Sequence, residues 1–121
     1  MGVPHYAGME GQMPHYMVQG GYSAEAWAGL MRSPEDRTAV VRAAVESVGG
    51  KLEALYYTFG SDDFVAFYEV PDNVQAAAAA IAVASSGRYR NFRTTPLLTA
   101  QEMVEAMRGS SKVSFRPAGA P

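Results

Sequence analysis

The segment 52–70 constrains the fold more than any other part of the chain. It contains two strand-like runs, 52–59 and 64–70, joined by Gly-Ser-Asp-Asp at 60–63. This pattern predicts a β-hairpin, because glycine and aspartate favour tight turns. Side chains alternate between the two faces of a strand, yet both runs place aromatic or aliphatic residues on both faces. Helices packed on one side would shield only one of these faces, so the other needs a partner.

The order of the other segments is typical of a βαββαβ unit. Alternation predicts a first strand over 15–20, and apolar residues recur at helical spacing from 23 to 48. After the hairpin come an alanine-rich helical segment over 73–84 and a last strand over 88–98. We therefore expect an α+β, ferredoxin-like fold, in which an antiparallel sheet carries its helices on one face.

The free face of this sheet predicts self-association. About five aromatic and aliphatic side chains there would expose on the order of several hundred Å², which is as much as a monomer usually shows. A symmetric homodimer that buries sheet against sheet, or a higher homo-oligomer, removes this surface from water. In the alternative, the last helix and the chain ends cover the face within one chain.

The chain divides into a central domain and two ends. Residues 1–12 are rich in glycine and methionine without periodicity, which predicts a flexible leader. Residues 13–108 form the domain, and its last helix is signalled by the capping pair Thr99 and Glu102. Residues 109–121, with several prolines and glycines, are predicted to be a loose C-terminal tail.

Local signals set the expected helix boundaries and faces. Ser23 is suited to cap a short first helix, and Ser33-Pro34-Glu35-Asp36 predicts a restart that runs to Gly49-Gly50. Pro71-Asp72 predicts the start of the alanine-rich helix. Helical spacing then places an inward stripe on Val74, Ala77, Ala78, Ile81 and Ala82.

Composition excludes several function classes. The chain has no cysteine, which excludes disulfides, thiolate metal sites and cysteine nucleophiles, and fits a cytoplasmic location. Its formal net charge of −2 is unfavourable for binding a phosphate backbone. The longest apolar run, over 74–84, is shorter than the roughly 20 residues that span a bilayer, and the N-terminus has no signal-peptide pattern. We expect neither a nucleic-acid nor a membrane partner.

The polar groups expected on the free sheet face are the candidate functional residues. An imidazole, a phenol, a carboxylate and a guanidinium around an apolar cavity would form a reasonable ligand site. The candidate catalytic residues are His15, Tyr57, Glu69 and Arg93, and the candidate ligand-binding residues are Met17, Gln19, Phe67 and Asp63. In the structural alternative, Glu69 and Arg93 form a cross-strand ion pair, and His15 is a solvated strand end. Asp62 and Asp63 then serve only the turn.

Metal and cofactor sites have little support in the pattern. The two histidines, His5 and His15, lie near the N-terminus and lack helical i, i+4 spacing. Glycine-rich nucleotide-binding motifs are absent from the sequence. We therefore expect no metal and no cofactor.

Several short motifs occur in a fixed order along residues 13–107. They are Met-Pro-His-Tyr at 13–16, Ser-Pro-Glu at 33–35, Gly-Gly-Lys-Leu at 49–52, Phe-Gly-Ser-Asp-Asp-Phe-Val at 59–65, Glu-Val-Pro-Asp at 69–72 and Arg-Thr-Thr at 93–95. The ordered set resembles the GYD domain family of small bacterial and archaeal proteins. The family takes its name from a Gly-(x)-Tyr-Asp hairpin. In this chain Asp62 replaces the tyrosine, while Gly60 and Asp63 keep their places.

The resemblance implies pairing as a dimeric α/β barrel. That wider group includes cofactor-free monooxygenases, isomerases, haem enzymes and binding modules, so the resemblance implies a fold and a dimer but no particular reaction.

Two functions follow from these features. The first is a small-molecule-binding protein or cofactor-independent enzyme for an apolar or oxygenated ligand, with a pocket between helices and sheet or inside the barrel. His15 would then be the acid–base group, Tyr57 and Arg93 would orient the ligand, and Glu69 would set the tautomer or accept a proton. The alternative is a non-catalytic oligomerisation or regulatory module with a filled interior.

Overall fold

The computed structural model describes residues 13–121. The predicted flexible leader, 1–12, lies outside this described part. The elements are β1 (His15–Tyr22), α2 (Ala24–Arg32), α3 (Thr38–Glu46), β2 (Lys51–Tyr57), β3 (Phe64–Glu69), α4 (Asn73–Ala84), β4 (Tyr89–Leu97) and α5 (Ala100–Ser110). Among these helices, none combines the length and the apolar content needed to cross a membrane.

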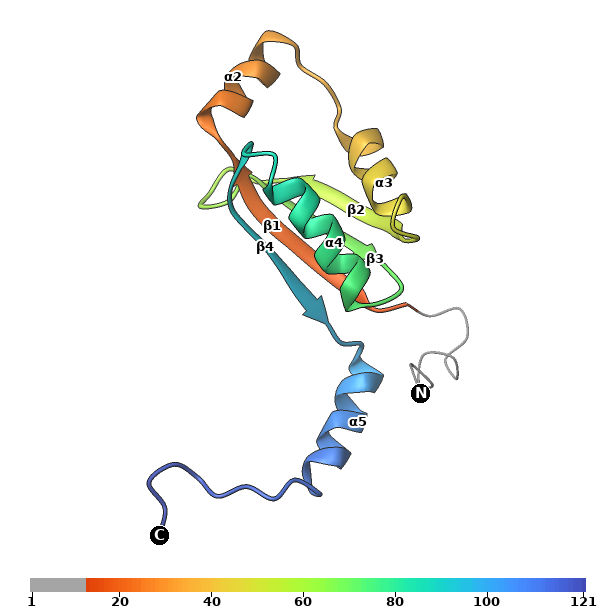
Figure 1. Cartoon of the computed structure of the whole chain (residues 1–121), viewed down its shortest axis with the longest axis vertical. Helices are drawn as coiled ribbons and strands as arrows, with labels where there is room; N and C mark the ends of the chain where they lie inside the picture. The colour runs from red at the N-terminus through yellow and green to blue at the C-terminus, as the bar shows by residue number, and fades with distance from the viewer. Residues whose placement is uncertain (1–12) are drawn as a thin grey trace.

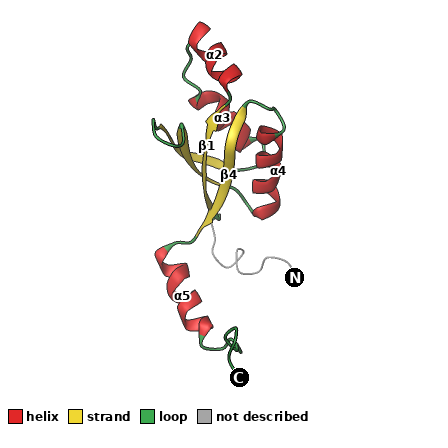
Figure 2. Ribbon diagram, turned by 90° about the vertical axis from the view of Figure 1, so that its left-hand side faces the viewer, coloured by secondary structure: helices red, strands yellow, loops and turns green. Residues whose placement is uncertain are grey.

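The four strands form one antiparallel sheet in the order β2-β3-β1-β4. This order confirms the predicted α+β class and is compatible with a ferredoxin-like fold. α3 and α4 lie against the same face of the sheet, α2 lies beyond one end, and α5 extends away from the other end (Figures 1 and 2). We call the face under α3 and α4 the covered face and the opposite one the open face.

The core lies between the covered face and the two helices. Rings of Tyr22, Phe64, Tyr89 and Phe92 form an aromatic cluster with centroid separations from 5.4 to 6.5 Å. Each of α3 and α4 contributes a single buried residue, so strand side chains make up most of the core. The buried apolar residues are Tyr16, Val18, Tyr22, Val45, Phe64, Ala66, Tyr68, Val70 and Ala76.

No helix of the described chain lies over the open face. Met17, Val65 and Phe67 project from it and are partly exposed. α5 has no buried residue, and its apolar side chains, such as Met107, face solvent. The last helix therefore does not cover this face within one chain (Figure 1). Residues 1–12, one of the two chain ends in the same alternative, lie outside the described part.

The first helical region is interrupted where a restart was predicted. Ser23 caps α2 through its side chain, as expected. Ser33, however, is the C-cap of α2, and α3 begins only at Thr38, so the predicted start at Ser33 is wrong. Pro34 disfavours helical backbone in the residue before it, and Ser33 has φ −142° and ψ 77°. The Asp36 carboxylate accepts a hydrogen bond from the Thr38 amide and turns the chain into α3.

The inward stripe predicted for α4 is also wrong. Val74 and Ile81 are 72% and 68% exposed. The inward face consists of Ala76, which is buried, with Ala79, Ala80 and Val83 beside it. A helix composed almost wholly of alanine has little amphipathic contrast, so spacing alone does not orient it.

We predict that Gly50→Ala destabilises the fold by about 1–3 kcal/mol, because it overpacks a dense contact. A Cβ at Gly50 would lie 2.2 Å from the Glu69 carbonyl oxygen and 2.5 Å from a Val70 methyl carbon. Gly60→Ala is the matched control, because nothing lies within 4 Å of a Cβ there. Urea unfolding of both variants measures the difference. Equal stabilities would contradict the packing described for the junction between α3 and β2.

Candidate functional site

An irregularity in β2 decides which side chains share a face. Between Leu52 and Ala54 this strand advances two residues while β3 advances one, so Glu53 is an additional residue. Such a bulge shifts the alternation of side chains. Beyond it, Tyr57 is paired with Phe64, whose side chain is buried on the covered face.

The prediction that Tyr57 joins His15 and Glu69 is therefore wrong. The Tyr57 hydroxyl lies 3.1 Å from the Tyr22 hydroxyl, on the side of the sheet opposite to His15. Burial raises the pKa of Tyr22 far above its usual value, and the hydrogen bond with Tyr57 raises it further. The Tyr22 phenol consequently stays protonated and serves packing and hydrogen bonding.

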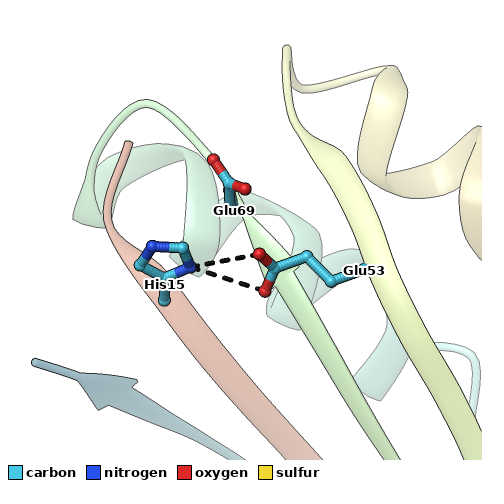
Figure 3. A group of neighbouring side chains, drawn as sticks. All are labelled: His15, Glu53 and Glu69. Carbon is cyan, nitrogen blue, oxygen red and sulfur yellow. Dashed lines mark hydrogen bonds and ion pairs between the residues drawn. The ribbon is translucent and has the colours of Figure 1, made fainter. Parts of the chain in front are cut away.

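On the open face the structure brings together His15, Glu53 and Glu69, one from each of three adjacent strands (Figure 3). His15 is paired directly with Glu69 across β1 and β3. Its Nδ1 lies 3.3 Å from Glu53 Oε2 and 3.4 Å from Oε1. One nitrogen or oxygen of each of the three side chains lies within 4.8 Å of the others.

The two carboxylates of this cluster disfavour each other's charge. Burial raises the pKa of Glu69, and the neighbouring Glu53 carboxylate raises it further. The charges of His15 and Lys51 act in the opposite direction and do not cancel it. The cluster thus places two carboxylates and one imidazole close together on the open face.

Arg93 starts from the same face but is engaged elsewhere. Its guanidinium donates to both carboxylate oxygens of Asp62 in the β2–β3 hairpin, at 2.8 and 3.2 Å. This hydrogen bonding lowers the pKa of Asp62. The alternative ion pair between Arg93 and Glu69 is therefore not formed.

Asp63 anchors the hairpin to the rest of the domain. Its buried carboxylate accepts hydrogen bonds from the Tyr22 amide at 2.9 Å, the Trp27 indole N–H at 3.0 Å and the Arg90 guanidinium at 3.1 Å. These donors occupy most of its acceptor capacity, which fits a structural role and leaves little for a ligand.

The other predicted ligand-binding residues do lie together. Met17 is paired with Phe67, and Gln19 is paired with Val65, so all of them belong to the central strands of the open face. They continue from the His15 end of the sheet toward the hairpin, on the face opposite to α3 and α4.

A pocket lies instead on the covered face, between the sheet and the helices α3 and α4. Its cavity has a volume of about 140 Å³. Among the described residues that line it, Arg37 alone is charged. The lining consists of Val18, Tyr22, Arg37, Val40, Val41, Ala44, Val45, Leu55, Phe64, Ala66, Tyr68, Ala79, Ala80, Val83, Tyr89 and Phe92.

Arg37 brings polar chemistry to this apolar pocket. Burial opposes its charge, but Tyr89 and Tyr22, which line the same pocket, raise the pKa of the guanidinium. Glu35 is its nearest carboxylate partner, with a separation of 3.7 Å between Nη1 and Oε1. This loose ion pair leaves the guanidinium with donors to spare.

Three features of these surfaces escape sequence reasoning. Strict alternation puts Glu53 and Tyr57 on one face, and the bulge, which has no local signal, separates them, so Glu53 lies beside His15 and Tyr57 does not. Ala79, Ala80 and Val83 form the α4 wall of the pocket. The sequence does not predict this, because a run of alanines has no apolar stripe that orients the helix. The sequence predicts one helix through Arg37, whereas the chain breaks between α2 and α3. This break places Arg37 at the N-cap of α3 and determines the direction of its side chain.

We predict that Asp63→Asn lowers the free energy of unfolding near pH 7 by about 1–3 kcal/mol, because charge-assisted hydrogen bonds are lost. Burial opposes the charged form, but the donors from Tyr22 and Trp27 and the charge of Arg90 hold the pKa of Asp63 below its usual value. Its stabilising contribution is thus complete above the unfolded-state pKa of about 3.9 and is lost as the pH falls through the lower folded-state pKa.

Urea unfolding at several pH values tests this contribution. The wild-type chain should lose more stability than Asp63→Asn on acidification below about pH 4. Glu46→Gln, on an exposed position of α3, is the control and should follow the wild type. An acid dependence that Asp63→Asn leaves unchanged would contradict the anchoring role.

The comparisons with known proteins give a family and no named relative. The family model described as the GYD domain matches residues 16–107, from β1 into α5. No curated protein and no solved structure matches the chain. The match covers most of the sequence and confirms the resemblance carried by the motifs along residues 13–107. The chain belongs to the GYD domain family.

Proposed function

We propose that this GYD-domain protein binds a small ligand with an apolar body and an oxygen-bearing, anionic end in the pocket between α3, α4 and the sheet. The observation that carries the proposal is the contrast within this pocket. An almost wholly apolar lining meets one guanidinium, that of Arg37. Binding pockets commonly combine apolar walls with a few polar groups that set orientation.

The volume supports a ligand about the size of one ring. The cavity of about 140 Å³ is close to the roughly 150 Å³ engineered cavity that accommodates benzene. Ala79 and Ala80 keep this space open, because larger side chains at the same positions of α4 would fill it. A short aliphatic chain or a single aromatic ring fits this volume.

The charge of the pocket supports an anionic end. Arg37 has donors beyond its contact with Glu35, and planar guanidinium groups bind carboxylates through paired hydrogen bonds. Tyr22 and Tyr89, whose phenols act on the charge of Arg37, line the same pocket. A carboxylate or phenolate oxygen would therefore be held at the Arg37 end of the cavity.

No reaction is assigned to this pocket. His15 and Glu69 project from the open face, so the sheet separates them from a ligand under α3 and α4. An acid–base role for them requires a ligand on the open face, within a barrel formed by two copies. Binding without catalysis is accordingly the function we favour.

We also infer that a second copy covers the open face and forms the dimeric α/β barrel. Met17, Val65 and Phe67 form an apolar strip there that no described helix covers. A two-fold contact would place the strips of two copies against each other and remove both from water. The exposed apolar side of α5, including Met103 and Met107, would add contacts to the same partner.

We predict that Ala80→Leu weakens the binding of benzoate, used as a probe, at least about tenfold, because the added side chain occupies the cavity. Ala78→Leu is the matched control, since Ala78 is exposed on the same helix and does not line the pocket. Ligand-observed NMR of the full chain measures both. Equal weakening by the two variants, or no detectable benzoate binding by the wild type, would contradict the proposed pocket.

The charge preference has its own test. Arg37→Gln should weaken benzoate binding by roughly 10- to 100-fold, the loss of a charged hydrogen bond, and should not weaken benzylamine. Arg42→Gln, at an exposed position on α3 outside the pocket lining, should leave both affinities unchanged. A preference of the wild-type chain for benzylamine would contradict the anionic end of the proposed ligand.

We predict that Val65→Lys converts the dimer into monomers, because each copy would bury a lysine charge against its partner. Val74→Lys is the matched control, since Val74 is 72% exposed on α4, away from the open face. Size-exclusion chromatography with light scattering measures the mass of each variant. A dimer that survives Val65→Lys but not Val74→Lys would place the interface on the helices instead.

A further inference from the structure

We propose that His15, Glu53 and Glu69 bind a first-row divalent metal ion, with Zn²⁺ as the reference ion, on the open face of the sheet. The inference is independent of the proposed ligand pocket, which lies on the opposite face. It departs from the expectation of no metal, because folding brings to His15 two carboxylates that lie 38 and 54 positions further along the chain.

The three side chains come from a rigid part of the molecule. They project from β1, β2 and β3, which are neighbours in the sheet, and His15 and Glu69 occupy directly paired positions. Glu53 is the additional residue of the β2 bulge, which turns its side chain toward His15 (Figure 3). Sites built on strands hold their geometry better than sites built on loops.

The spacing fits a metal with little movement. Two ligands about 2.1 Å from a tetrahedral ion lie about 3.4 Å apart. His15 Nδ1 and Glu53 Oε2 are already 3.3 Å apart. The third donor, on Glu69, lies within 4.8 Å of both, so a small side-chain rotation would complete a three-ligand set.

A simple ion pair between His15 and Glu53 does not account for the arrangement. Glu69 adds a second carboxylate to the same place, where it meets repulsion from Glu53. The Glu69 carboxylate lies within 4.8 Å of both His15 and Glu53, so the cluster offers three donors and not two. A divalent cation would satisfy both carboxylates and the imidazole at once.

The donor set selects the class of metal. One imidazole nitrogen and two carboxylate oxygens suit zinc and its neighbours, whereas Ca²⁺ and Mg²⁺ favour all-oxygen sites. Three protein ligands leave at least one coordination position open. Because this position faces away from the sheet, water or a donor from a second copy would occupy it.

The test is a Zn²⁺ titration of the untagged full chain against a chromophoric chelator. The wild type should bind an equimolar amount of Zn²⁺, and should bind Zn²⁺ in preference to Mg²⁺. Glu53→Gln and Glu69→Gln preserve the shape of the side chain, and each should weaken Zn²⁺ binding at least about tenfold. Loss of a residue that only hydrogen-bonds to a metal ligand already lowers metal affinity by about that much, so loss of a ligand should lower it further. Glu105→Gln on α5 and His5→Ala are the matched controls and should bind as the wild type does.

Three results would overturn the proposal. They are the absence of equimolar Zn²⁺ binding, wild-type affinity in both glutamine variants, and loss of binding in His5→Ala. Circular dichroism and light scattering without metal establish that each variant keeps its fold and assembly. If Glu69→Gln does not fold, Glu53→Gln decides the outcome, because Glu53 is an exposed residue in a bulge of an edge strand.

Discussion

A sheet that is apolar on both faces but carries its helices on one is the constraint on which the other features depend. α3 and α4 cover the side of Tyr22 and Phe64, and each of these helices buries only one residue. The alanine-rich wall of α4 is too thin to fill the space beneath it, so a cavity remains. The opposite side keeps Val65 and Phe67 without a covering helix.

The sheet therefore separates two kinds of chemistry. Under the helices, Arg37 is the charged group in an apolar space, which favours a small ligand with an anionic end. On the open face, His15, Glu53 and Glu69 gather donors for a cation within a surface suited to self-association. The Asp63 carboxylate accepts a hydrogen bond from the Tyr22 amide. This bond connects the β2–β3 hairpin to β1, and these strands carry residues of both sites.

The sequence predicts most of the fold because its signals are local. The turn at Gly60, the side-chain cap at Asp72 and the capping box of Thr99 with Glu102 are all formed as expected. The pocket and the open-face cluster are less predictable, because two features that shape them, the β2 bulge and the orientation of α4, have no local sequence signal. The bulge at Glu53 reverses the faces expected for Tyr57, and a run of identical alanines does not reveal which side of α4 meets the sheet.

The most direct test of the central claim is an isotope-filtered NOE measurement on a mixture of ¹³C-labelled and unlabelled chains. It detects only contacts between different copies. We expect intermolecular signals from the methyl groups of Met17 and Val65 on the open face. The absence of intermolecular signals, or signals confined to α3 and α4, would contradict the claim that a second copy covers this face.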